Sequence, residues 1–149
     1  MNINNARKIL TEIQGCFREL NRQPIKEKEM LNQSNGFNYL QFRSWLTKDD
    51  KVAEIVTYLS VDQDLVLISM YFYGGHEEIV SPEMFVLINN INDSDPSHYW
   101  IIHPDDNKLE FRTAYIVSES QFDKDQFKSV LKTFLEQGPS HYAFMKYLN

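Results

Sequence analysis

The chain has 149 residues, and its 15 Lys and Arg against 21 Asp and Glu give a formal net charge of −6. Hydrophobic residues at 42% can build a compact core, which excludes disorder as the main state, and the length predicts a single domain over residues 1–149. The lone Cys16 excludes an internal disulfide and a cysteine-cluster metal site. Because no apolar run could span a membrane and residues 1–5 do not resemble a signal peptide, we expect a cytoplasmic protein without a membrane partner.

Charge is distributed unevenly along the chain. Residues 1–43 carry a balance of +3, residues 44–123 a balance of −11, and the last 26 residues a balance of +2. An acidic centre would repel phosphates, so no nucleic-acid partner is predicted. The centre is either a solvated acidic sheet between mildly basic helices or a surface that attracts a basic or amphipathic segment of a protein partner.

The first half of the chain changes from helical to strand periodicity. Apolar residues three and four apart predict an amphipathic helix over 4–21, and 26–36 is interpreted as a polar connection that ends in a turn. Alternating β-branched and aromatic residues predict strands at 37–46, 53–61 and 65–73. Their short connectors favour an antiparallel meander.

The second half predicts a helix, two strands and a last helix. Pro82 opens the first of these helices, which ends near Asp95. Strands follow at 97–103 and 108–117, and the last helix begins after Asp123.

Gly138 and Pro139 are expected to break or bend that last helix, after which a helical stripe could continue. The predicted class is α+β, a curved antiparallel sheet of about five strands packed with three helices in the order α-β-β-β-α-β-β-α.

The histidines predict no metal site. His98 and His103 lie five residues apart in one strand, so they point to opposite faces. The cluster His76, Glu77 and Glu78 has suitable ligand types but lacks the HExxH spacing, and a solvated acidic loop is expected there. We predict no metal and no cofactor.

Catalytic motifs are equally absent from the sequence. With five glycines the chain has neither a G-x-S-x-G elbow nor a Gly-rich phosphate loop. Cys16 lies at the edge of an apolar helical stripe, which predicts a buried hydrophobe and not a thiolate nucleophile. The pairs Asp49–Asp50 and Asp105–Asp106 lie in turns, where Asp is expected for backbone reasons. No catalytic residue and no enzymatic activity are predicted.

Aromatic residues are the one excess of this sequence. The first and third predicted strands place them on both sheet faces: Phe37, Tyr39, Phe42, Trp45, Tyr71, Phe72 and Tyr73. Either one face lines the core and the other lies beneath the terminal helices, or one face is exposed and binds an extended peptide or a second subunit.

The middle helix has an apolar arc wider than one sheet face can cover. We expect it to form an isologous homodimer interface together with a neighbouring strand. The predicted interface residues are Met84, Leu87, Ile88, Ile91 and Trp100.

Three segments resemble the YbjN family, which is described as bacterial sensory transduction regulators. They are the helix ending in Leu-Ile-Asn-Asn-Ile-Asn at 87–92, the strand Leu-Glu-Phe-Arg-Thr-Ala-Tyr at 109–115, and the helix with Phe127, Val130 and Phe134. The element order is also similar to that of type III secretion chaperones. These resemblances imply a curved antiparallel sheet packed with helices and a homodimer formed through the middle helix, and they carry over no catalytic residue.

Two functions are compatible with these patterns. The first is a non-enzymatic, homodimeric protein-binding domain of the chaperone-like or regulatory kind. The alternative is a small-molecule sensor or cryptic enzyme with a pocket between helices and sheet, where Tyr71, Tyr115, Arg112 and His103 would converge. Arg112 itself is expected to reach solvent or an acidic cross-strand neighbour.

Overall fold

The computed structural model describes residues 1–20, 22, 25–32, 37–48, 51–73, 81–95, 97–117 and 122–147. Within them lie three helices and six strands. In chain order these are α1 (Ile3–Glu19), β1 (Ile25–Asn32), β2 (Phe37–Lys48), β3 (Lys51–Ser60), β4 (Leu65–Tyr73), α2 (Pro82–Ser94), β5 (His98–His103), β6 (Lys108–Ile116) and α3 (Lys124–Tyr147).

All six strands form one antiparallel sheet in the order β1-β2-β3-β4-β6-β5. The first four strands are sequential neighbours. For β2, β3 and β4 the short connectors predict this arrangement, whereas β1 was not predicted. The chain then passes through α2 to the far edge, where it forms β5, and returns as β6 between β5 and β4. In register, Phe111 of β6 lies between Met70 of β4 and Trp100 of β5.

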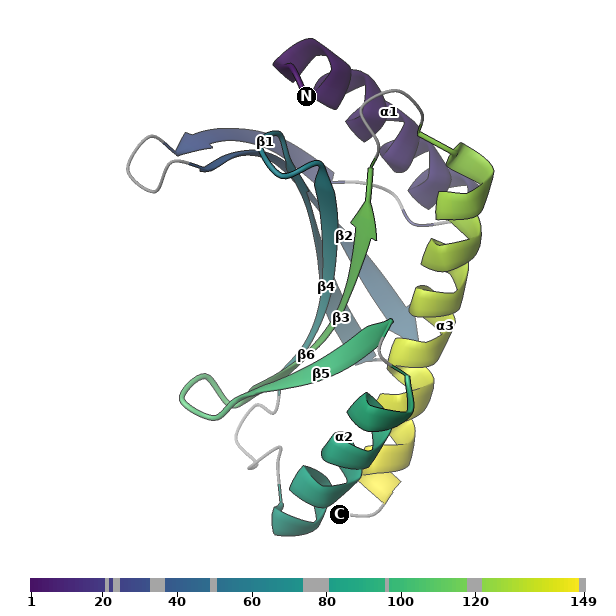
Figure 1. The fold of residues 1–149 in the computed structure, drawn as a ribbon. Coiled ribbons are helices and arrows are strands. Elements are labelled where there is room, and N and C mark those ends of the chain that lie inside the picture. Colours follow the sequence, from purple (N-terminus) through teal and green to yellow (C-terminus); the bar gives the residue numbers. More distant parts are fainter. Residues whose placement is uncertain are drawn as a thin grey trace.

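The sheet is strongly curved, and the helices lie on its convex side (Figure 1). Helix α1 packs against β2 and α3 packs against β6, while the two helices also contact each other. Helix α2 lies beside the edge strand β5. The concave side carries no helix of the described chain (Figure 1). We call this concave side the open face.

The core fills the space between the convex side of the sheet and the helices. Alternate residues of strands β2 to β6 point into it, because side chains of a strand alternate between two faces. Phe17 of α1 meets Phe42 of β2 edge to face at 5.0 Å, and Phe134 of α3 stacks on Phe111 of β6 at 4.9 Å. The fully buried side chains with the largest volumes are Phe17, Phe42, Phe111, Phe127, Phe134, Ile13, Ile55, Leu59, Ile68, Met70, Met84 and Leu109.

The α+β class and the curved antiparallel sheet with three helices are confirmed, but the sheet has one more strand than the predicted order. Residues 26–36 were interpreted as a polar connection, whereas residues 25–32 form the edge strand β1, paired with β2. The misinterpretation has a physical cause. An edge strand is held by backbone hydrogen bonds to one neighbour, and the charged run Lys-Glu-Lys-Glu at 26–29 carries no apolar alternation to reveal it.

The predicted break at Gly138 and Pro139 is wrong, because α3 continues through both residues. Packing compensates for the hydrogen bond that Pro139 cannot donate. Beyond it Tyr142 stacks on Phe72 at 4.2 Å, and Met145 is fully buried. The predicted continuation of the helical stripe is therefore confirmed for these two residues.

Candidate functional site: the open face of the sheet

The open face is built from residues that lie side by side across four strands. One row runs from Glu54 of β3 through Tyr71 of β4 and Glu110 of β6 to Ile101 of β5. Arg112 extends the next row, where it lies between Ser69 of β4 and Tyr99 of β5. Because neighbouring residues in register share a face, these side chains all project away from the helices.

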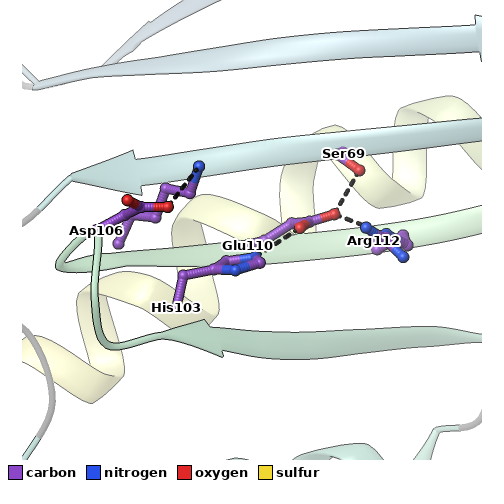
Figure 2. A network of polar contacts seen from close by, with 6 residues as sticks. Ser69, His103, Asp106, Glu110 and Arg112 are labelled. Atoms are coloured by element: carbon purple, nitrogen blue, oxygen red, sulfur yellow. Dashed lines mark hydrogen bonds and ion pairs between the residues drawn. The ribbon is translucent and has the colours of Figure 1, made fainter.

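A buried carboxylate forms the centre of a polar network on this face (Figure 2). Glu110 is only 1% exposed, yet it has three partners. The hydroxyl of Ser69 donates to its Oε2 at 2.6 Å, and Nε of Arg112 donates to the same oxygen at 2.6 Å. Nε2 of His103 lies 2.8 Å from the other oxygen, Oε1. A separate ion pair joins Lys108 to Asp106 at 3.6 Å in the adjoining turn.

The network keeps the carboxylate charged. Burial alone would raise the pKa of Glu110, but the hydrogen bonds from Ser69, Arg112 and His103 outweigh it and lower the pKa. Burial, together with the negative charge of Glu110, also raises the pKa of the neighbouring Tyr71 to about 12. At neutral pH the face therefore presents a carboxylate paired with Arg112 beside an un-ionised tyrosine.

These residue types resemble those of a serine hydrolase, but their order does not. In a hydrolase the histidine takes the proton of the serine, and the carboxylate orients the histidine. Here Glu110 lies in the middle, and the hydroxyl of Ser69 donates its hydrogen bond to Glu110 instead of to His103. Ser69 is also fully buried and cannot reach a substrate. Ser69, His103 and Arg112 are arranged to hold the buried charge of Glu110.

Aromatic side chains surround the network on the open face. Tyr39 and Tyr58 meet edge to face at 5.6 Å, and Nζ of Lys108 lies 4.8 Å above the ring of Tyr71. Large parts of three further rings remain in contact with solvent: Trp45 at 43% exposed, Tyr73 at 53% and Tyr99 at 37%. Exposed aromatic rings on a rigid sheet are typical of protein-binding surfaces.

Toward the other end of the strands the open face becomes apolar. Leu67 lies opposite Ala114, and Leu65 lies opposite Ile116, which is 81% exposed. We call these four residues the apolar strip. Acidic turns border the face at both ends, with Asp62 and Asp64 after β3 and Asp105 and Asp106 after β5. Apolar surface within an acidic border is complementary to a segment that carries both apolar and basic residues.

The pocket residues expected of a sensor or cryptic enzyme are only partly brought together. Tyr71, Arg112 and His103 converge around Glu110, but on the open face and not between helices and sheet. Tyr115 lies on the opposite face, where its ring meets Phe127 of α3 at 5.3 Å. Arg112 was expected to reach solvent or an acidic cross-strand neighbour. Its side chain is 29% exposed, and its acidic partner is Glu110 of its own strand instead of a cross-strand acid.

The predicted interface residues divide into two groups. Met84, Ile88 and Trp100 are at most 3% exposed within one chain, whereas Leu87 and Ile91 are partly buried and pack against the core. The large apolar side chains that α2 leaves in solvent are Phe85 at 51% and Val86 at 64% exposed. A second copy meeting α2 would therefore first encounter Phe85 and Val86.

Asn92 of α2 is a positioning residue that no sequence signal distinguished from its neighbours Asn89 and Asn90. It contacts the outer edge of β5 at the backbone of Trp100. Pairing to a side chain satisfies backbone groups of an edge strand that have no strand partner.

The remaining sequence predictions concern single side chains. His98 and His103 do point to opposite faces, since His98 contacts Phe134 in the core and His103 lies on the open face. Cys16 is fully buried, and burial raises the pKa of its thiol. His141 is half-buried, and its Nδ1 accepts a hydrogen bond from Nε1 of Trp100 at 3.3 Å.

Metal and membrane predictions were also compared with the described residues. Among those residues no three His, Cys, Asp or Glu side chains lie close enough to hold a metal ion. The cluster at residues 76–78 lies outside them. Over the same part of the chain, no helix combines the length and apolar character needed to cross a membrane.

Comparisons with known proteins give a likeness in fold. No protein-family model and no curated protein matches the sequence, so the resemblance to the YbjN family remains a prediction. A chain in the solved structure titled "Crystal Structure of the ExsC-ExsE Complex" is similar, with a TM-score of 0.62 and 13% sequence identity. The similarity covers 99% of this chain and 96% of that one. The predicted type III secretion chaperone-like fold is thereby confirmed.

Proposed function

We propose that this chain is a non-enzymatic protein-binding domain of the chaperone-like or regulatory kind, acting in the cytoplasm as a homodimer. In this proposal residues 1–149 form one domain that holds a partner segment on its open face. The fold likeness supports a protein partner, because the similar chain was solved in a complex named for two components, ExsC and ExsE. Kinship with the YbjN regulators is a further part of the proposal.

The observation that carries the proposal is the uncovered side of the sheet. A sheet normally buries one face and exposes a polar one, but this exposed face combines aromatic rings with the apolar strip. Ile116 projects from it at 81% exposure, and Tyr99, which lies opposite Arg112 on β5, is 37% exposed. Covering such a surface with a partner removes apolar area from water, which favours association.

The partner segment should be amphipathic and basic. The apolar strip provides its apolar contacts, and the acidic turns at both ends of the sheet attract its basic residues. Long-range attraction of this kind acts mainly on the association rate. The rate should therefore fall steeply as salt shortens the Debye length below about 8 Å.

Helix α2 is the proposed dimer surface. Its exposed face holds Phe85 and Val86 beside Glu83 and Asp93, and the helix contains no basic residue. Leu87 and Ile91 border this patch and keep part of their surface exposed. The buried Met84, Ile88 and Trp100 would support such an interface from beneath.

Two synthetic peptides test the binding surface. They share the same apolar positions, and one carries Lys and Arg where the other carries Asp and Glu. We expect the basic peptide to bind at least about tenfold more tightly, and Ile116→Asn to weaken its binding because the apolar contact is lost without a change of charge. Phe144→Asn is the matched control, because Phe144 is a 54% exposed aromatic on α3. Equal binding of both peptides, or equal loss in the two variants, would contradict the proposal.

Sedimentation equilibrium at micromolar concentration tests the dimer separately. The wild type should sediment as twice 17.6 kDa. Val86→Asp should shift it toward the monomer, because a charge would be buried in the interface, while Phe144→Asp should leave the association unchanged. A wild-type monomer would refute the dimer and leave the open-face proposal intact.

A further inference from the structure

A pocket of about 540 Å³ lies at the corner where β5 begins beside α3. It exists because the two last strands differ in length. Pairing between β5 and β6 ends at His98 and Thr113, while β6 continues to Ile116. The space beside Ala114 and Tyr115 that a longer β5 would fill is therefore left open, and α3 borders it from the other side.

Hydrogen bonding in the pocket wall fixes one acceptor. The hydroxyl of Thr113 donates its proton to the carbonyl of Ser97 at 3.0 Å. At the 3.3 Å contact between Thr113 Oγ1 and His98 Nδ1, the proton must then come from His98. In the neutral tautomer with the proton on Nδ1, Nε2 is the acceptor nitrogen of the imidazole ring.

Two further groups make the wall rich in acceptors. Oε1 of Gln137 is buried and has no hydrogen-bond partner among the described residues, so the side chain of Gln137 must rotate before this oxygen can accept from a bound group. Oδ1 of Asp95 accepts from the backbone N–H of Ser97 at 3.1 Å and from its hydroxyl at 2.5 Å. These bonds lower the pKa of Asp95, so the carboxylate is ionised at neutral pH. No Lys or Arg is among the residues that line the pocket.

We propose that this pocket binds a cationic nitrogen donor on an alkyl stem, an ammonium or guanidinium group. Its nitrogen would lie among Asp95, His98 and Gln137, and its stem would lie against Val130 and the ring of Tyr115. Charge-assisted hydrogen bonds to a carboxylate are the strongest available here. Either a small amine or a basic side chain of a protein can supply the group. Because a small amine would bind without a partner, the inference is independent of the proposed protein-binding function.

Titration of the ¹⁵N-labelled full chain, followed by NMR, tests the site. The probes are butylammonium and agmatine, with 1-butanol and butyrate as the neutral and anionic counterparts of the same stem. We expect amide shifts centred on His98, Thr113 and Gln137, and binding of the two cations at least about tenfold tighter than that of butanol or butyrate. Equal binding of all four probes, or no shift at these residues with cations and peptide alike, would overturn the proposal.

Charge variants separate the pocket from general electrostatics. Gln137→Glu should tighten cation binding several-fold, and Asp95→Asn should weaken it by a similar factor. Glu136→Gln removes an exposed charge one residue away on α3 and should change nothing. If Glu136→Gln weakens binding as much as Asp95→Asn does, the site is refuted.

A short Arg-containing peptide distinguishes the two sources. Competition between this peptide and agmatine at the same residues supports a site open to both. Shifts with the peptide alone assign the pocket to a basic side chain of a protein, whereas shifts with the amines alone assign it to a small ligand.

Discussion

Asn92 pairs with Trp100 through both backbone groups of that residue. The N–H of Trp100 donates to Oδ1 of Asn92 at 2.7 Å, and Nδ2 of Asn92 donates to the carbonyl of Trp100 at 3.0 Å. The amide of Asn92 thus acts as one residue of a missing neighbouring strand. This contact joins α2 to the outer edge of the sheet at the point where Trp100 packs on Phe111 at 4.7 Å.

Asn92→Ala should lower the free energy of unfolding by about 1–3 kcal/mol, because two partly buried backbone groups lose their partners. Asn89→Ala is the control, since Asn89 is exposed on the same helix and the gain in helix propensity is the same. Urea unfolding of both variants measures the difference. Equal stabilities would mean that water replaces the side chain of Asn92 without cost.

Thr57 and Thr113 are both buried threonines of the sheet, at 0% and 2% exposure, with opposite hydrogen-bond status. The hydroxyl of Thr57 has no partner among the described residues, whereas that of Thr113 is bonded to Ser97 and His98. Thr57→Val should therefore stabilise the protein by about 1 kcal/mol, and Thr113→Val should destabilise it by about 1–2 kcal/mol. Thermal unfolding gives the sign, and a loss of stability in Thr57→Val would show that its hydroxyl is satisfied.

Local sequence patterns predicted where helices and strands lie, but they did not predict what each element packs against. Strand β4 spans the predicted residues 65–73, because turns and alternation delimit it. The charged edge strand β1 was not predicted, because it is defined by its pairing with β2 and not by a pattern in its own sequence. The continuity of α3 through Pro139 also depends on distant partners, such as Phe72 beneath Tyr142.

The polar network around Glu110 was less predictable, because it also depends on residues that are distant in the sequence. Glu110 and Arg112 lie two residues apart on β6 and therefore share a face, as strand periodicity requires. The burial of Glu110 depends on Ser69, 41 residues earlier in the chain, and on His103 across a turn. Periodicity places a side chain on a face, but it cannot tell which face the helices cover.

Glu110→Gln should lower the free energy of unfolding at pH 7 by about 2–4 kcal/mol, because Arg112 and His103 lose the charge that they share. The folded pKa of Glu110 lies below its ordinary value of 4.5, so its contribution is present above that value and is lost as pH falls through the folded pKa. The difference between wild type and variant should shrink accordingly in acid. Glu136→Gln controls for net charge, and a difference that stays constant down to pH 2 would contradict the assignment.

Gly15 and Gly138 are helical glycines whose replacement by alanine should have different effects. A Cβ on Gly15 would meet only Nζ of Lys124 at 3.9 Å, which is an ordinary contact. Gly15→Ala should thus stabilise α1 by about 0.5–1 kcal/mol through lower entropy of the unfolded chain.

A Cβ on Gly138 would lie 2.7 Å from Sδ of Met70 and 3.1 Å from the ring of Phe111. Met70 can move its flexible end, but Phe111 is fixed between Phe134 and Trp100. Gly138→Ala should therefore cost about 1–3 kcal/mol by overpacking. This cost cancels or exceeds the gain of about 1 kcal/mol in helix propensity, so the variant should be no more stable than the wild type. Chemical unfolding of the two variants side by side measures both effects. If Gly138→Ala proves as stabilising as Gly15→Ala, then Gly138 of α3 does not lie as close to Met70 of β4 and Phe111 of β6 as the structure places it.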